Sequence, residues 1–118
     1  MYKQRDIVLI PMPYTDFSAR KNRPALVISR DTYNEASTDI MVVMITATRN
    51  RMPYDIAIGA DDMADGTLPK TSFVRADRIF SIAQKLIVKP FGSVTEAFHQ
   101  SVCSAVGELI SLPKENVL

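Results

Sequence analysis

The sequence predicts a small, mainly β (α+β) fold: a barrel or sandwich of short strands followed by an amphipathic C-terminal helix. Three observations support this fold class, namely β-branched runs of strand length, turn residues between them, and a change to helical periodicity near the C-terminus. The chain has 118 residues, of which 47% are hydrophobic and 23% are charged. We therefore expect one domain, residues 1–118, around a packed core.

Two strands separated by a polar loop are predicted in the N-terminal third. The first strand, residues 7–10, is expected to stop at Pro11, because proline cannot donate to a sheet ladder. The loop spans residues 14–22. The second strand, residues 24–29, begins with Pro24, at the position in a strand where a missing N–H does least harm.

The middle of the chain contains the predicted central strand. Residues 40–48 place apolar side chains alternately on both faces, which is typical of a strand buried on both sides. Shorter strands are predicted at residues 54–58, 72–79 and 85–88, with turn residues at 64–66. Several short strands in succession indicate a barrel or a sandwich.

An amphipathic helix is predicted at the C-terminus, where apolar residues repeat at spacings of three and four. Ser93 and Glu96 have the spacing of a capping box at its start, and Pro113 marks its end. The residues that form the apolar stripe are Val94, Phe98, Val102, Ala105, Val106 and Leu109.

Charge is balanced over the chain, with 14 basic and 13 acidic residues and a formal net charge of +1. This balance gives the molecule no overall positive charge that would attract nucleic acid, so any nucleic-acid site must be a local basic patch. One such patch lies between residues 17 and 30, which contain no Asp or Glu. Its basic residues are Arg20, Lys21, Arg23 and Arg30.

Cysteine usage and the N-terminus both indicate a cytoplasmic protein. The single cysteine, Cys103, has no partner for an internal disulfide, which fits a reducing compartment. The apolar run at residues 7–10 is too short for a signal sequence or a membrane span. We therefore expect no membrane association.

Most familiar catalytic motifs are absent from the sequence. There is no phosphate-binding loop, dinucleotide fingerprint, nucleophile elbow or spaced set of metal ligands, so we expect no metal and no cofactor. His99 and Cys103 are four residues apart on the predicted helix and could form a nucleophilic pair. Without a third orienting group, a coincidental pair on a helix surface is the preferred interpretation.

Arg23 is a candidate phosphate ligand. The following Pro24 restricts Arg23 to extended backbone angles and so fixes where its side chain leaves the chain. The planar guanidinium can donate two hydrogen bonds to phosphate oxygens, and such charge-assisted bonds contribute about 1.5–3 kcal/mol. The alternative is an ordinary ion pair with a nearby carboxylate, which composition alone favours.

Arg75 and Asp77 are two residues apart in a predicted strand and therefore share one face. One could act as a base and the other as a cation. The alternative is an exposed ion pair, which contributes only about 0–1 kcal/mol. Periodicity does not decide between these interpretations.

Four sequence blocks in order resemble the signature blocks of the MazF/PemK toxins: residues 6–10, 23–29, 45–46 and 74–77. The resemblance implies an SH3-like, CcdB-related barrel that forms a symmetric homodimer. It also implies a type II toxin that acts as a metal-independent, sequence-selective endoribonuclease. Its implied partners are RNA and a MazE/PemI-like antitoxin whose C-terminal tail blocks the RNA groove, with DNA contacted only through the antitoxin complex.

The resemblance also implies roles for four residues, which match the catalytic positions of the family: Arg23, Thr46, Arg75 and Asp77. Cleavage of RNA without a metal uses the ribose 2′-OH as the nucleophile. Asp77 is then the candidate base, Arg75 an acid or charge stabiliser, and Arg23 with Thr46 the phosphate ligands, although the assignment of acid and base between Asp77 and Arg75 stays open. Further candidates for RNA binding are Asp16, Arg20, Lys21, Arg49 and Arg78.

Two positions depart from the family pattern. Arg5 stands where the family often has Gly, and residues 14–19 replace the usual Gly-Ser-Glu type of loop. Because that loop is expected to contact RNA, the cleavage sequence cannot be transferred from a relative.

Two other classes of function compete with the nuclease. One is a non-catalytic binding module on the same barrel, either a CcdB-like topoisomerase inhibitor or a degenerate toxin that acts as a regulator. The presence of Arg23, Thr46, Arg75 and Asp77 argues against it. The other, a structural oligomerisation domain, is favoured only by the apolar helix and ranks last.

Overall fold

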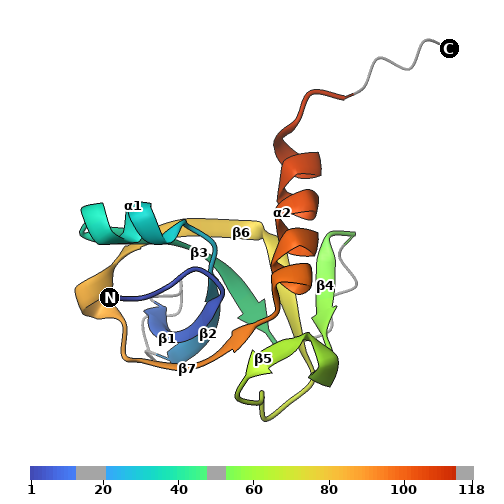
Figure 1. The fold of residues 1–118 in the computed structure, drawn as a ribbon. Coiled ribbons are helices and arrows are strands. Elements are labelled where there is room, and N and C mark those ends of the chain that lie inside the picture. Colours follow the sequence, from blue (N-terminus) through green and yellow to red (C-terminus); the bar gives the residue numbers. More distant parts are fainter. Residues whose placement is uncertain (13–20, 48–52, 114–118) are drawn as a thin grey trace, which may run out of the picture.

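A strongly curled antiparallel sheet forms the body of the molecule, and the helix α2 rises from one side of it (Figure 1). The computed structural model describes residues 1–12, 21–47 and 53–113. The strands are β1 (Asp6–Met12), β2 (Lys21–Val27), β3 (Asp39–Thr46), β4 (Asp55–Ile58), β5 (Met63–Asp65), β6 (Ser72–Ala83) and β7 (Lys89–Val94). The helices are α1 (Asp31–Ala36) and α2 (Glu96–Ile110), with single 3-10 turns at Ala60–Asp62 and Gln84–Leu86.

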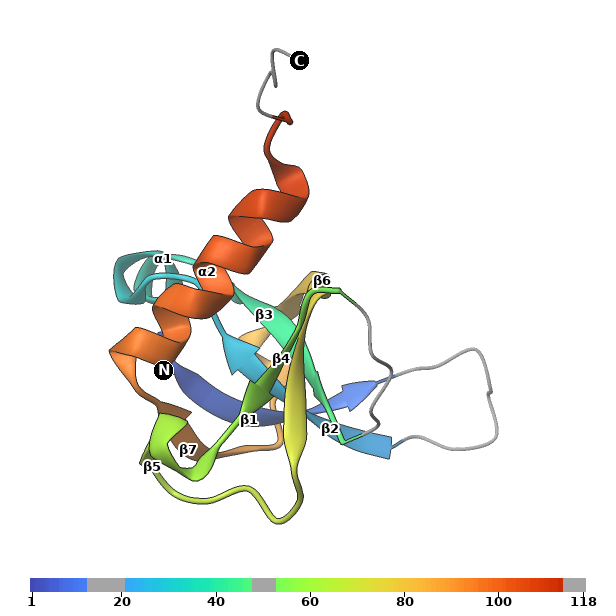
Figure 2. The same cartoon turned by 90° about the vertical axis from the view of Figure 1, so that its right-hand side faces the viewer.

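The strands form one seven-stranded sheet in the order β4-β6-β3-β2-β1-β7-β5. The sheet curls into a half-barrel, with β4 and β5 as its two edges, so the predicted mainly β fold with a C-terminal helix is confirmed. Figure 2 shows the curl from the side, with α2 projecting beyond the sheet. Within the described chain, no helix is long and apolar enough to cross a membrane.

Both faces of β3 are buried, as predicted for the central strand. Val43 and Ile45 belong to the core cluster that also contains Phe98 of α2. Val42 and Met44 belong to a second cluster on the opposite face of the sheet. The apolar side chains on the two faces of β3 therefore belong to two separate cores, and α2 covers one of them.

Two prolines lie inside strands, so the predicted boundaries at Pro11 and Pro24 are wrong. β1 continues to Met12, with Pro11 opposite Asn22, and β2 begins three residues before Pro24. At both prolines the strand has a pairing partner on one side only, because the β1–β7 ladder reaches only Leu9 and the β2–β3 ladder begins after Pro24. A strand tolerates proline where the missing N–H would face an unpaired side.

The last part of the sheet also differs from the prediction. Residues 72–79 are the first part of a longer strand, β6, and residues 85–88 contain a 3-10 turn rather than a strand. The following strand is β7, whose Lys89 and Pro90 pair with β1. The short helix α1 and the edge strand β5 were not predicted, because neither has an apolar periodicity of its own.

The helix α2 forms where predicted, but its cap is different. Phe98 and Val102 are buried against the sheet. The N-cap is Thr95, whose hydroxyl accepts a hydrogen bond from the Phe98 backbone N–H at 3.1 Å. The predicted capping box from Ser93 is wrong, because β7 pairing continues through Val94 and delays the start of the helix.

Candidate nucleic-acid interface

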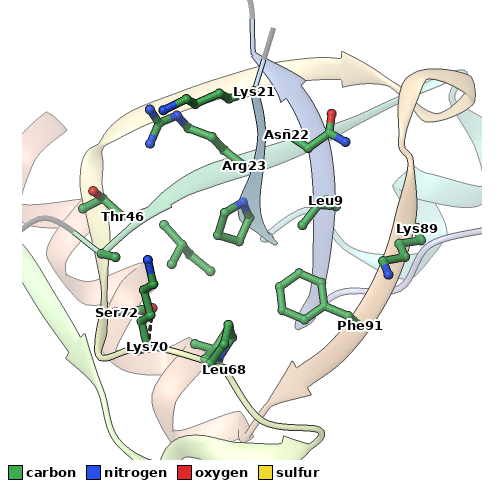
Figure 3. Close-up of a pocket in the computed structure, with 14 residues that line it drawn as sticks. Leu9, Lys21, Asn22, Arg23, Thr46, Leu68, Lys70, Ser72, Lys89 and Phe91 are labelled. Atoms are coloured by element: carbon green, nitrogen blue, oxygen red, sulfur yellow. Dashed lines mark hydrogen bonds between the residues drawn. The ribbon is translucent and has the colours of Figure 1, made fainter. Parts of the chain in front are cut away.

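A cleft of about 470 Å³ lies where β2 begins, β3 ends and β6 begins (Figure 3). Arg23 and Thr46, two of the residues predicted to bind phosphate, both line it. They are far apart in the sequence and come together because β2 and β3 are neighbours in the sheet. The cleft thus joins two of the four predicted catalytic residues.

The strand register explains this convergence. Ala25 lies opposite Met44, so two residues further along the same register Arg23 comes level with Thr46. Thr46 in turn lies opposite Phe73 of β6. The neighbouring strands β2, β3 and β6 therefore place these side chains at one end of the sheet.

Arg75 lies beside this cleft but does not line it. Its direct neighbours across the sheet are Met44 on β3 and Asp55 on β4. Because Thr46 pairs with Phe73, Arg75 is the diagonal neighbour of Thr46 on the same face, a relation that places Cα atoms about 7–8 Å apart. A side chain as long as arginine spans such a separation.

Two carboxylates hold Arg75 in place. Its Nε lies 3.3 Å from Oδ1 of Asp55, and it donates to Asp77 from Nε at 3.1 Å and from Nη2 at 2.9 Å. The Arg75 side chain is only 13% exposed. The predicted contact between Arg75 and Asp77 is therefore present, within a three-residue network that the sequence spacing alone did not indicate.

Asp77 occupies a bulge in β6. Val43 pairs with Ile79 but the adjacent Met44 pairs with Arg75, so residues 76–78 have no partner on β3. Bulges re-aim side chains and are frequent next to active sites. The hydrogen bond from Arg75, opposed in part by desolvation, lowers the pKa of Asp77 and so favours its ionised form.

The cleft is positively charged. Among the described residues, its lining includes Lys21, Arg23, Lys70 and Lys89, and no Asp or Glu. The sequence predicted Lys21 and Arg23 but missed Lys70 and Lys89, which are isolated lysines in distant segments. Only the neighbouring positions of β7 and β1 bring Lys89 to the cleft.

The two other basic candidates that the structure describes, Arg30 and Arg78, do not line the cleft. Arg30 lies beyond the end of β2, at the start of α1, and lines a different hollow. Arg78 is exposed in the β6 bulge and does not line the cleft. Asp16, Arg20 and Arg49 lie outside the described residues.

His99 and Cys103 do contact one another, with 3.4 Å between Nε2 and Sγ. Burial lowers the pKa of His99, with a further contribution from the charge of Arg5, and burial raises the pKa of the Cys103 thiol. Both shifts favour the neutral forms, whereas a nucleophilic pair needs a thiolate. The directions of these two pKa shifts therefore agree with the interpretation that this pair is not catalytic.

Comparison with solved structures shows the fold. An endoribonuclease in complex with its cognate antitoxin from a mycobacterial species has a TM-score of 0.78 and 24% identity, covering 96% of this chain and 98% of that one. MazF in a MazE–MazF complex from Deinococcus radiodurans has a TM-score of 0.77 and 18% identity, covering 95% and 98%. At these identities the likeness concerns the fold alone.

Comparison with known sequences gives the family. Endoribonuclease MazF1 of Mycobacterium bovis is 29% identical over 91 residues, which cover 77% of this chain and 81% of that protein. Endoribonuclease MazF4 of Mycobacterium tuberculosis matches with the same identity and coverage. A model of the PemK-like, MazF-like toxins of type II toxin–antitoxin systems matches residues 3–110. This chain therefore belongs to the PemK-like, MazF-like toxin family.

Proposed function

We propose that this protein is a toxin that cleaves single-stranded RNA as a metal-independent, sequence-selective endoribonuclease. The observation that carries the proposal is the convergence of Arg23 and Thr46 on one cleft whose charged lining residues, in the part of the chain that the structure describes, are all basic. The mycobacterial relatives named endoribonucleases support it. The proposed partners are a second copy of the chain and a cognate antitoxin, since related toxins have been solved in complex with one.

In the proposed reaction the ribose 2′-oxygen attacks phosphorus while the bond to the 5′-oxygen of the next nucleotide breaks. The products are a 2′,3′-cyclic phosphate and a 5′-hydroxyl end. Arg23 and Thr46 bind the non-bridging oxygens, and Arg75 stabilises the charge that develops on them. Asp77 is the candidate base for the 2′-hydroxyl proton, and the leaving 5′-oxygen takes a proton in turn.

Incubating the purified protein with a mixed-sequence transcript in excess EDTA tests this function. We expect fragments whose 5′ ends accept labelled phosphate from a kinase without prior phosphatase treatment, which identifies them as 5′-hydroxyls. Mapping these ends also gives the cleavage sequence. Intact RNA, with protein that is folded and soluble, would overturn the proposal and favour a non-catalytic binding module.

Substitution at the cleft tests the assigned residues. Arg23→Ala should lower kcat/KM roughly tenfold to a hundredfold, if its hydrogen bonds contribute about 1.5–3 kcal/mol to the transition state. Arg30→Ala is the matched control, because Arg30 is an exposed arginine away from the cleft. An unchanged rate for Arg23→Ala would remove Arg23 from the site.

Asp77→Asn keeps the shape of the side chain and removes the base. Loss of a general base typically costs about a hundredfold to ten-thousandfold. Because its pKa is lowered, Asp77 is a weak base, so we expect a loss near the lower end of that range. Wild-type turnover in this variant would make Asp77 a positioning partner of Arg75.

A further inference from the structure

One half of the cleft is apolar, and phosphate binding does not account for it. Figure 3 shows Leu9, Leu68 and Phe91 on the side away from Thr46, with the Phe91 ring exposed to the cleft between them. These side chains offer no hydrogen bonds to a phosphodiester. They form instead an apolar surface beside a cationic one, within a volume typical of ligand pockets, about 300–1,000 Å³.

The backbone around Phe91 is tightly held. A Cβ atom on Gly66, whose φ is +76°, would approach the Phe91 carbonyl oxygen to 2.7 Å. A Cβ on Gly92, whose φ is +155°, would approach the carbonyl oxygen of Asp65 to the same distance. Only glycine permits this close approach of the β5 end to β7, which fixes the strand that carries the ring.

Lysines stand on either side of the apolar surface. Lys89 precedes Phe91 on β7 and Lys70 lies just before β6; both are exposed and line the cleft (Figure 3). Lys21 and Arg23 are at the opposite rim. A cationic track around an aromatic ring is the arrangement with which proteins bind single-stranded nucleic acids, by stacking a base and pairing the flanking phosphates.

We propose that Phe91, with Leu9 and Leu68, forms a subsite for the nucleobase next to the scissile phosphate, and that Lys70 and Lys89 contact the adjoining phosphates. This inference rests on the proposed ribonuclease function and names specificity-determining residues for it. A base that fits against Phe91 places its own phosphate toward Arg23 and Thr46. The subsite thus couples base recognition to the position of the cleaved bond.

The test measures binding rather than cleavage, with 2′-O-methyl RNA, which has no attacking hydroxyl. The oligonucleotide spans the mapped cleavage site, or is of mixed sequence if no cleavage occurs. Phe91→Leu keeps the apolar contact with the core and removes the ring. Phe91→Tyr keeps the ring and serves as the rescue variant, and Phe80→Leu is the control at another half-buried phenylalanine.

Phe91→Leu should raise the Kd about fivefold or more, since stacking on one aromatic side chain contributes about 1–3 kcal/mol. Phe91→Tyr and Phe80→Leu should bind as the wild type does. An abasic nucleotide is then placed at each position of the oligonucleotide in turn. At one of these positions it should weaken binding to the wild-type protein by a similar factor. At that position the loss should vanish in Phe91→Leu, because the two changes remove the same contact.

The lysines are tested by the salt dependence of binding. Lys70→Ala and Lys89→Ala should each reduce the slope of log Kd against log salt by about 0.7, the value for one phosphate contact on a single strand. Lys85→Ala, an exposed lysine outside the cleft, should leave the slope unchanged.

The proposed subsite would be overturned if Phe91→Leu bound RNA with wild-type affinity. It would also be overturned if the losses caused by the abasic nucleotide and by Phe91→Leu were additive at every position. Wild-type cleavage by Phe91→Leu, with the same cut sites, would leave the nuclease intact and remove only the subsite. Binding that depends on Phe91 without any cleavage would refute the nuclease alone.

Discussion

Arg5 has a backbone conformation that favours glycine. Its φ is 80°, and it is the only described non-glycine residue with a positive φ. The family resemblance implies a glycine here, and glycine adopts this φ without strain. The Arg5 side chain offsets part of the cost of this backbone conformation. Its Nη1 donates a hydrogen bond to the carbonyl oxygen of Val94 at 3.0 Å and so joins the start of β1 to the end of β7.

Substitutions at Arg5 separate backbone strain from this hydrogen bond. Arg5→Ala loses the hydrogen bond and keeps the strain, whereas Arg5→Gly loses both. A non-glycine residue in the left-handed conformation destabilises the folded state by about 1–2 kcal/mol. Glycine removes this strain, but it also makes the unfolded chain more flexible, which offsets about 0.4–1 kcal/mol of the gain. Denaturant unfolding should therefore find Arg5→Gly more stable than Arg5→Ala by about 0.5–1 kcal/mol. An alanine variant that is equally stable would show that φ is not strained.

His99 should make the stability of the fold depend on pH. Burial, with the charge of Arg5, lowers the pKa of its imidazole in the folded state. Folding therefore favours neutral His99, and the unfolded chain binds the proton more readily. The contribution of His99 to stability is present above the unfolded pKa and is lost as the pH falls through the folded pKa.

Unfolding midpoints measured between pH 8 and pH 5, about the range of histidine titration, should fall toward acid in the wild type. His99→Gln should flatten this dependence. Tyr33→Gln, on the neighbouring helix α1, is a control that leaves the imidazole in place. An equal slope in the wild type and in His99→Gln would assign the dependence to other groups.

At the scale of elements, β6 connects the structural core to the candidate site. Its first part pairs with both β3 and β4, and its last part pairs with β3 alone. The bulge at residues 76–78 separates these parts and releases Asp77 from the ladder. A regular strand would hold Asp77 opposite β3. The bulge leaves its side chain 36% exposed, whereas that of Arg75 is 13% exposed.

The start of α2 provides a test at this scale. Thr95→Ala removes the hydroxyl that accepts the Phe98 N–H and should lower the free energy of unfolding by about 1 kcal/mol, within the usual range of about 0.5–2 kcal/mol for an N-cap. Ser93→Ala should have a smaller effect, because Ser93 lies in β7 opposite Asp6. The reverse order of the two variants would restore the capping box predicted from the sequence.

At the scale of the whole molecule, the end of α2 extends beyond the sheet (Figure 2). Apolar side chains at this end of the helix are exposed. Leu109 is 37% exposed, Ile110 is 77% exposed, and Leu112, just beyond the helix, is 90% exposed. Exposed apolar patches mark interaction sites. We propose that these three side chains belong to such a patch and contribute to the proposed homodimer.

Ile110→Asp should shift the protein from dimer toward monomer in sedimentation or light-scattering measurements, because it places a charge in the proposed interface. Leu86→Asp is the control, since Leu86 is 51% exposed on a different part of the molecule. An unchanged mass for Ile110→Asp would exclude the end of α2 from the interface, and a monomeric wild type would refute the homodimer itself.

Local patterns in the sequence were sufficient for the fold class, the central strand and the helix α2. Apolar alternation in β3 and the three-and-four spacing of Phe98 and Val102 are properties of neighbouring residues, and these determine which faces are buried. The same short-range spacing anticipated the contact between Arg75 and Asp77. Strand ends were predicted poorly at Pro11 and Pro24, because tolerance of proline depends on which side of a strand is paired.

The composition of the cleft was decided only by the tertiary structure. Arg23 and Thr46 were named from a family resemblance, but their meeting requires β2 beside β3. No sequence pattern marks Lys70, Lys89 or Phe91. Pairing of β7 with β1 brings Lys89 and Phe91 to the cleft, and Lys70 reaches it from the segment before β6. Side-chain periodicity is local, whereas a binding site forms where distant segments meet, so the sequence determined the elements and their faces and the strand order determined the site.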